Sequence, residues 1–135
     1  MPLDADVREL FDKPNYVHLA TLLPDGWPHA VTVWSNPVDD DRLRFFTRPA
    51  SRKAKNVARD PRVCLSVVDR DNPYRMASVR GRVVETRDGE AALEWMDATA
   101  IKYTGKPFPM RSGTLYVVEP EHVWSMTLPF EEGAG

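Results

Sequence analysis

The stretch RLRFFTRPASRKAKNVARDPRVCLSVVD at residues 42–69 carries the pattern that decides the fold. Residues 42–47 predict a strand, which an Arg-Pro-Ala turn then ends. Ser51 is a favourable N-cap residue, so we expect a short helix over residues 52–59. The apolar run at residues 62–69 predicts a buried strand. A strand, a helix and a second strand therefore follow one another within one short segment.

The expected helix has one apolar face. Ala54, Val57 and Ala58 follow one another at i, i+3 and i+4, so we expect these three side chains to be buried. Residues 2–13 show a similar apolar stripe and predict a second short helix, which Pro14 ends. Both helices are short, so they depend on packing against a sheet.

Two further strands are predicted before the basic segment. Residues 16–23 and 28–35 read as strands, and Pro24-Asp25-Gly26 between them is typical of a turn. A turn is also expected at residues 36–41, before the strand at residues 42–47. The connections are too short for parallel crossovers, so we expect these three strands to form an antiparallel meander.

The second half of the chain predicts more strands and one longer helix. The expected elements are a loop at 69–73, a strand at 76–86, a helix at 88–103, a loop at 104–112, one or two strands at 114–126 broken at 119–120, and a frayed tail at 128–135. Six to seven short antiparallel strands with a few short helices predict a mainly β fold. A small β-barrel is favoured over an open sandwich, as a single domain over residues 1–135.

Charge is distributed unevenly along the 135 residues. The formal net charge is −2, yet residues 42–62 contain eight Lys or Arg residues and one acid, Asp60. One concentrated basic block in an acidic chain indicates a specific anion site more than a nucleic-acid surface. The alternative is a solvated charged face. No apolar run is long enough to span a membrane and the N-terminus does not resemble a signal peptide, so we expect a cytoplasmic protein.

Side chains typical of catalytic or metal sites are not apparent. Cys64 is the single cysteine, which excludes an internal disulfide and a Cys-based zinc site, and its apolar neighbours indicate a buried thiol. None of His18, His29 and His122 has a partner at metal-ligand spacing. Dinucleotide-binding and P-loop motifs are absent. The sequence therefore identifies no catalytic residue and no metal site, and a cofactor would have to supply the chemistry.

The turn between residues 47 and 52 has the features of a phosphate site. A strand ends at the hydroxyl residue Thr47, and the helix begins with Ser51, Arg52 and Lys53. The free N–H groups at the start of the helix, its dipole and two cations converge at one place. The alternative is an ordinary N-cap followed by solvated basic residues.

Several segments together resemble the pyridoxamine 5′-phosphate oxidase-like flavin and deazaflavin proteins, especially the small actinobacterial branch that uses coenzyme F420. They are HLATLLPDGWPHAVTVW at residues 18–34, LRFFTRPASRKAKNVARDPRVCLSVVD at 43–69, DNPYRMASVRGRVVE at 71–85, KYTGKPFP at 102–109 and LYVVEPEHVW at 115–124. The resemblance covers residues 5–126. It implies a split β-barrel of the FMN-binding type and a homodimer, with each cofactor in a groove between the two subunits.

The resemblance also implies which residues bind the cofactor. They comprise a strand along the ring system, the phosphate-binding turn and helix, and one residue of a neighbouring strand, contributed by the other subunit. These residues are His29, Ala30, Val31, Thr32, Val33, Phe46, Thr47, Ser51, Arg52, Lys53, Asn56 and Met76. Tyr74 and Arg75 are expected beside Met76, and Tyr103, Pro107 and Trp124 are candidate walls of a substrate cleft.

One departure from the family pattern bears on the choice of cofactor. The flavin-binding oxidases carry a phosphate-binding arginine on the strand after the first turn, where this chain has Val31. This difference weakens the expectation of tight binding of flavin mononucleotide (FMN), although Arg48, Arg52 and Lys55 could substitute. Coenzyme F420 has a phosphodiester and a polyanionic tail, which suit the basic block.

Three functions remain open from the sequence. The favoured one is an oxidoreductase that uses reduced coenzyme F420 to transfer hydride to a small unsaturated organic substrate. The second is an FMN-binding reductase or oxidase of the same family. The third is a non-catalytic protein that binds or stores the cofactor. Nucleic-acid binding is disfavoured, because aromatic residues do not alternate with the basic ones after Phe46.

Overall fold

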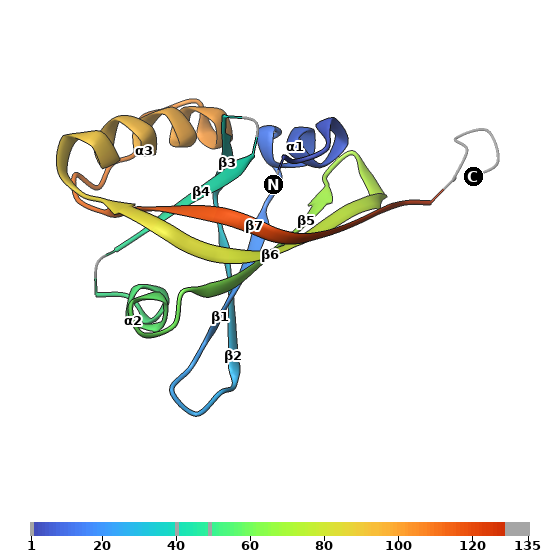
Figure 1. Ribbon diagram of the computed structural model, residues 1–135. Helices are drawn as coiled ribbons and strands as arrows, with labels where there is room; N and C mark the ends of the chain where they lie inside the picture. Colours follow the sequence, from blue (N-terminus) through green and yellow to red (C-terminus); the bar gives the residue numbers. More distant parts are fainter. Residues whose placement is uncertain (1, 40, 49, 129–135) are drawn as a thin grey trace.

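The computed structural model describes residues 2–39, 41–48 and 50–128, and confirms a mainly β fold consistent with a split barrel (Figure 1). Within these residues the helices are α1 (Ala5–Asp12), α2 (Arg52–Arg59) and α3 (Gly89–Thr104). The strands are β1 (Val17–Leu22), β2 (Pro28–Val33), β3 (Ser35–Val38), β4 (Arg42–Thr47), β5 (Arg62–Asp69), β6 (Asn72–Arg87) and β7 (Thr114–Thr127). The seven strands form one antiparallel sheet in the order β2-β1-β5-β6-β7-β4-β3.

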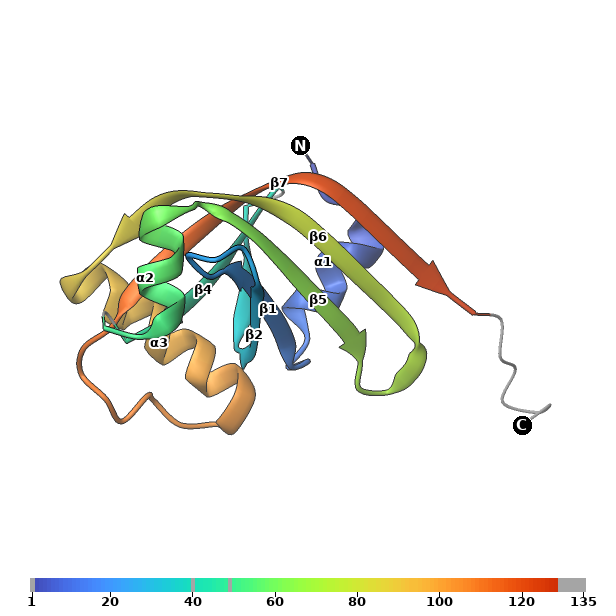
Figure 2. The same cartoon turned by 90° about the horizontal axis from the view of Figure 1, so that it is seen from below.

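The two edge strands of this sheet are consecutive in the chain. β2 pairs with β1, β3 pairs with β4, and only Trp34 separates β2 from β3. The chain therefore bends at Trp34 and supplies both edges, which requires the sheet to curl (Figure 2). β6 and β7 cross the middle of the curled sheet.

The predicted meander is wrong, because β4 pairs with β3 and β7 instead of β2. A turn is predicted at Asn36 and Pro37, whereas these two residues lie in strand β3. Proline is a turn signal, but it is also tolerated on an edge strand, where its missing N–H breaks no ladder. Ser35, fully buried, anchors this strand through a hydrogen bond from its Oγ to the Arg44 carbonyl at 2.6 Å.

The central strands are longer and more continuous than predicted. β6 begins at Asn72 instead of Met76, and β7 runs through the expected break at residues 119–120. The ladder shifts register there, from Arg80 opposite His122 to Gly81 opposite Pro120. A bulge absorbs the proline, so the strand bends without ending.

The helices form close to their predicted positions. α2 packs on β1, and α3, expected at residues 88–103, packs on β7. One expectation about α2 is wrong: Ala58 is exposed, and Asn56 is fully buried with Ala54 and Val57. Asn56 Nδ2 donates a hydrogen bond to Thr21 Oγ1 at 2.9 Å, which compensates for burying a polar side chain.

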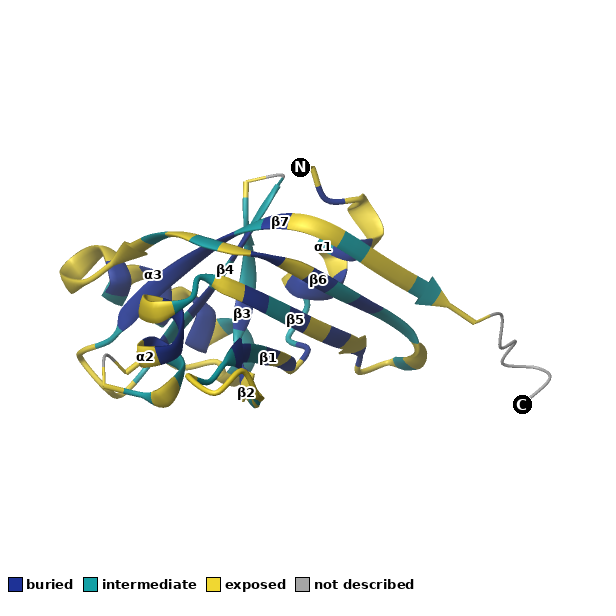
Figure 3. Cartoon of the chain, turned by 60° about the horizontal axis from the view of Figure 1, so that its bottom comes forward, coloured by how far each residue is buried: buried dark blue, intermediate teal, exposed yellow. Residues whose placement is uncertain are grey.

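The hydrophobic core has two parts. The larger part fills the concave side of the sheet, with Phe11, Leu19 and Phe45 among its fully buried residues. Buried and exposed residues alternate along β5, as Figure 3 shows. The smaller part lies between α3 and β7, centred on Trp95 and Met96. Within the described residues no helix has the length and apolar character needed to cross a membrane.

Gly81 is required where β6 passes the bulge in β7. A Cβ atom at this position would lie 2.2 Å from the carbonyl oxygen of Glu119, a backbone atom that cannot rotate away. We expect Gly81→Ala to lower the free energy of unfolding by about 3 kcal/mol, the upper range for overpacking. Urea denaturation measures this loss.

Val84→Ala is the matched control on the same strand, because the Val84 side chain is more than half exposed. We expect it to cost less than about 1 kcal/mol. Equal stability of Gly81→Ala and the unsubstituted protein would contradict the assigned close approach of the two strands.

Candidate cofactor cleft beside the start of α2

A cleft of about 240 Å³ opens between the β2–β3 bend, β4 and the start of α2. It brings together four residues that the sequence analysis assigned to the cofactor site, namely Thr32, Val33, Phe46 and Lys53. The remaining lining residues, Tyr16, Trp34 and Phe108, are all aromatic. The cleft therefore has flat apolar walls and one cation.

The start of α2 has the predicted capping geometry. Ser51 Oγ accepts the Ala54 N–H at 3.1 Å and is also hydrogen-bonded to Thr47 Oγ1 at 3.0 Å. The cap uses the third N–H group of the helix, so those of Arg52 and Lys53 have no partner within the helix. Two backbone donors and the positive end of the helix dipole are thus available to an anion.

The structure divides the basic block into two halves. Four of its eight cations have partners within the protein: Arg42 with Glu119 at 3.4 Å, Arg62 with Asp60 at 2.7 Å, Arg59 with the Leu22 carbonyl, and Arg44 over the Trp95 ring at 5.8 Å. Among the described residues, the other four have no carboxylate partner: Arg48, Arg52, Lys53 and Lys55. These four flank the start of α2, and we call them the unpaired cations.

Lys53 is the unpaired cation that lines the cleft. Its pKa is lowered from the ordinary lysine value, first by partial burial and then by the positive charge of Arg48. Both effects disfavour an isolated charge at this position. A bound anion would offset both effects, because its negative charge would stabilise the protonated amine and neutralise the repulsion between the two cations.

The open edge of β2 provides further backbone donors and acceptors. The Leu23 N–H donates to the Trp27 carbonyl at 2.8 Å, which sets the alternation of the β1–β2 ladder. Bonded and non-bonded pairs alternate in an antiparallel ladder, so the backbone groups of Ala30 and Thr32 point away from β1. Thr32 also lines the cleft. Ala30 and Thr32 are therefore the residues of the predicted stretch 29–33 whose main-chain groups can form hydrogen bonds with a cofactor ring.

The aromatic wall was only partly identified from the sequence. Trp34 stacks on Tyr103 with ring centroids 5.0 Å apart, and Phe46 meets Phe108 edge to face at 5.1 Å. Phe46 and Tyr103 are among the residues predicted from the sequence, whereas Trp34 and Phe108 are not. Trp34 continues the two-residue alternation of Ala30 and Thr32, which was an available signal. Phe108 follows the Pro107 that was named, and Pro107 itself is exposed.

Comparison with known proteins now assigns the chain to a family. The family model described as pyridoxamine 5′-phosphate oxidase matches residues 3–127, nearly the whole chain. The chain belongs to the pyridoxamine 5′-phosphate oxidase family. This is a family of flavin-binding oxidoreductases.

Similar family members include two bacterial proteins named pyridoxine/pyridoxamine 5′-phosphate oxidase. The one from Thermobifida fusca is 47% identical over 53 residues, covering 39% of this chain and 24% of the relative. The one from Cupriavidus taiwanensis is 35% identical over 88 residues, covering 65% of this chain and 41% of the relative. The matched segments thus span less than half the length of these curated relatives.

Solved structures resemble the chain over most of its length. A structure named F420 reductase has a TM-score of 0.80 and 29% identity, covering 90% of this chain and 98% of its own. A conserved hypothetical protein from Mycobacterium tuberculosis has a TM-score of 0.79 and 24% identity, covering 98% and 92%. The second likeness shows the fold alone.

In this family member, hydrogen bonds from the end of α3 hold the bend at Trp34 that shapes the cleft. Tyr103 donates its hydroxyl proton to the Asn15 carbonyl at 2.5 Å, and burial raises its pKa to about 12. Lys102 Nζ donates to the Phe11 carbonyl at 2.9 Å, to the Ser35 carbonyl at 2.7 Å and to Asn36 Oδ1. Tyr103 therefore supports Trp34 from behind, as a wall residue whose hydroxyl points into the protein.

Some predicted site residues lie away from the cleft. Val31 packs against the core, and Asn56 is fully buried against Thr21. Met76 pairs with Val68 near the end of β5, whereas α2 precedes the beginning of that strand. Its neighbour Arg75 is bound to Asp69 at 3.1 Å and to Glu9 at 2.9 Å, so it is committed to an internal ion-pair network.

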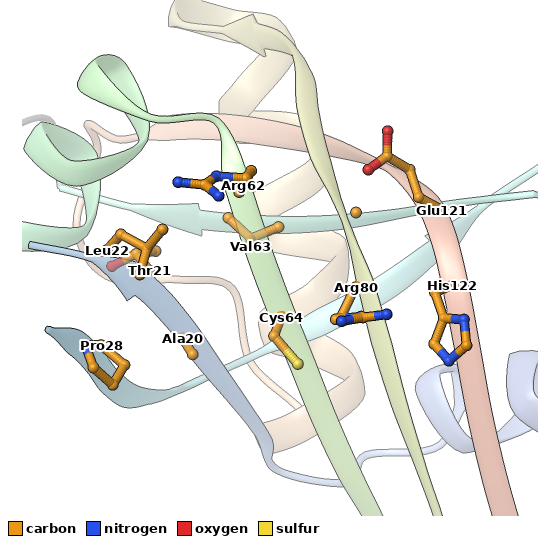
Figure 4. A pocket seen from close by; sticks show the side chains of 11 residues that line it. Ala20, Thr21, Leu22, Pro28, Arg62, Val63, Cys64, Arg80, Glu121 and His122 are labelled. Carbon is orange, nitrogen blue, oxygen red and sulfur yellow. The ribbon is translucent and has the colours of Figure 1, made fainter. Parts of the chain in front are cut away.

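Met76 and Trp124 share the outer face of the sheet with a shallow hollow of about 560 Å³. Cys64, Arg80 and His122 lie side by side in that hollow, on β5, β6 and β7 (Figure 4). Cys64 is half-buried and its Sγ lies 3.3 Å from Ser78 Oγ. Trp124 is 48% exposed on this face, unlike the aromatic residues around Phe46.

Lys102 makes the stability of the cleft wall depend on pH. Burial lowers its pKa to about 8 from the ordinary value of 10.5. Between these values the unfolded chain binds more protons than the folded protein, so the contribution of Lys102 to stability rises with pH. We subtract the unfolding free energy of Lys102→Met from that of the unsubstituted protein. We expect this difference to increase from pH 7.5 to about 10.5.

Denaturant titrations of both proteins across this range measure the shift, and other titrating groups cancel in the difference. A difference that is constant with pH, or that moves toward methionine, would show that Lys102 is not buried as assigned.

Proposed function

We propose that the protein is an oxidoreductase that uses reduced coenzyme F420 to transfer hydride to a small unsaturated organic substrate. The observation that carries this proposal is the cluster of Arg52, Lys53 and Lys55, three of the unpaired cations, at the start of α2 beside an aromatic cleft. A phosphodiester with a polyanionic tail would contact several cations along a path, whereas a single phosphate needs one compact site.

The β2 strand supports coenzyme F420 over FMN. Val31 stands where the flavin-binding oxidases carry a phosphate-binding arginine, and its side chain packs against the core. The exposed positions on either side are Ala30 and Thr32, which carry no charge. This strand would therefore contribute hydrogen bonds and no cation, so the phosphate would be bound by α2 and the turn before it. The loss of one of two phosphate contacts weakens the binding of a small ligand more than the binding of a long polyanion.

The residues of the cleft would bind and orient the cofactor. Bound coenzyme F420 would supply the hydride, and among the described residues no carboxylate or histidine lines the cleft. Lys53 and the free N–H groups of α2 would hold the phosphate. Trp34 and Phe46 would pack against the ring system and exclude water, while the backbone of Thr32 would bind its polar edge.

We further propose that the cleft is completed by a second copy of the chain in a cytoplasmic homodimer. The outer face of the sheet carries Met76, half-exposed Trp124 and exposed Val68, which suits it to an interface. A second copy on this face would bring its Met76 toward the cofactor, as the family resemblance implies. The same contact would remove exposed apolar surface from water.

Charge reversal at Lys53 tests the cofactor site. We expect Lys53→Glu to remain folded and to lose at least about tenfold in affinity for coenzyme F420, since a cation beside the phosphate becomes an anion. Lys106→Glu makes the same charge change at an exposed residue outside the cleft, and should alter the affinity by less than about twofold. Fluorescence titration with the coenzyme measures both.

Equal affinities of the two variants would remove Lys53 from the phosphate site. Oxidation of reduced coenzyme F420 by a panel of enones and quinones then separates a reductase from a storage protein, because storage predicts tight binding without turnover.

A further inference from the structure

A second cleft of about 210 Å³ lies next to the cofactor cleft, and the two share Phe46 and Phe108. The two rings meet edge to face at 5.1 Å and form a partition between the clefts. The other residues that line it are Thr47, Arg48, Met96, Met110 and Ser112. We call it the methionine cleft. Its composition differs from that of the cofactor cleft, which contains no methionine.

The walls of the methionine cleft are apolar and adaptable. Met96 is almost fully buried and reaches its position because residue 113 is glycine: a Cβ there would lie 2.8 Å from both Sδ and Cε of Met96. Methionine is flexible and polarisable, so it packs against hydrophobic ligands of different shapes. The absence of a side chain at Gly113 therefore preserves space for the thioether next to the cleft.

The loop that carries Phe108 and Met110 is fastened to α3. Asp97 accepts the Phe108 N–H at 3.1 Å and binds the guanidinium of Arg111 through two hydrogen bonds at 2.8 and 3.0 Å. Arg111 also donates to the Phe108 carbonyl at 2.8 Å. The bidentate ion pair of Asp97 and Arg111, together with the hydrogen bonds of both residues to the Phe108 backbone, holds the partition in one place. The methionine cleft is thus formed before any ligand binds.

One cation stands at this cleft. Arg48 is exposed and has no carboxylate partner among the described residues, and no acidic residue lines the cleft. Thr47 and Ser112 are the other polar residues of the lining. An apolar body packed between Phe108 and Met96 could therefore carry one negative charge toward Arg48 at low desolvation cost.

We propose that the methionine cleft binds a hydrophobic organic anion, with its apolar body against Met96, Met110 and Phe108 and its charged group at Arg48. This names the substrate class of the proposed reductase, and its catalytic part rests on that proposal. The binding itself requires only the residues of this cleft. This ligand would then lie directly beside the cofactor, separated from it by the two rings of the partition.

A fluorescent hydrophobic anion, 8-anilinonaphthalene-1-sulfonate, tests the site without any coenzyme. We expect its emission to increase on binding to the unsubstituted protein. Met110→Asp should weaken binding at least about fivefold, because it places an acid in the apolar lining. Ile101→Asp is the matched control, since Ile101 and Met110 are both 51% exposed and Ile101 lines neither cleft. Its affinity should stay within about twofold of the unsubstituted protein.

The charge of the ligand is tested in the same titration. Arg48→Glu should weaken binding at least about fivefold, whereas Arg70→Glu, at an exposed arginine outside both clefts, should leave it within about twofold. Absence of binding, or equal effects within either pair of variants, would overturn the proposal. Coenzyme F420 is absent throughout, so failure here and failure of the Lys53→Glu titration are distinguishable.

Discussion

The chain bends at Trp34 between two paired strands, and the rest of the site depends on this bend. Because β2 and β3 lie at opposite edges of one sheet, the single residue between them forces the sheet to curl. The same bend places Trp34 at the mouth of the cleft, where Tyr103 stacks behind it. α3 holds the bend through hydrogen bonds to Ser35, so the barrel and the cleft wall share one set of contacts.

Charges and aromatic packing have separate roles around the clefts. The protein neutralises or covers half of its basic block and leaves four cations unpaired at the start of α2. Unpaired cations on neighbouring positions repel one another, which costs stability unless an anion binds. The aromatic partition of Phe46 and Phe108 lies beside these cations and separates two clefts with different linings. One arrangement would thus serve the proposed polyanionic cofactor and the proposed hydrophobic anion.

Local patterns predicted the elements well, and long-range pairing poorly. The cap at Ser51, the bounds of α2 and the mainly β class follow from propensity and spacing, which act over a few residues. The pairing of β4 with β7 could not be predicted, because it depends on which distant strands share a core. Asn36 and Pro37 match a turn pattern, but an edge strand tolerates proline, so these residues form a strand instead. Phe108 was missed because Asp97 on α3 holds the loop that carries it, and no local sequence pattern indicates this contact.

We propose that the unpaired cations of α2 and the uncharged β2 strand together select a long polyanionic cofactor. Side-by-side calorimetric titrations of the purified protein with coenzyme F420 and with FMN test this selectivity. We expect coenzyme F420 to bind at least about tenfold more tightly than FMN, because its tail would reach cations that a single phosphate cannot. Equal binding of the two cofactors, or tighter binding of FMN, would contradict it.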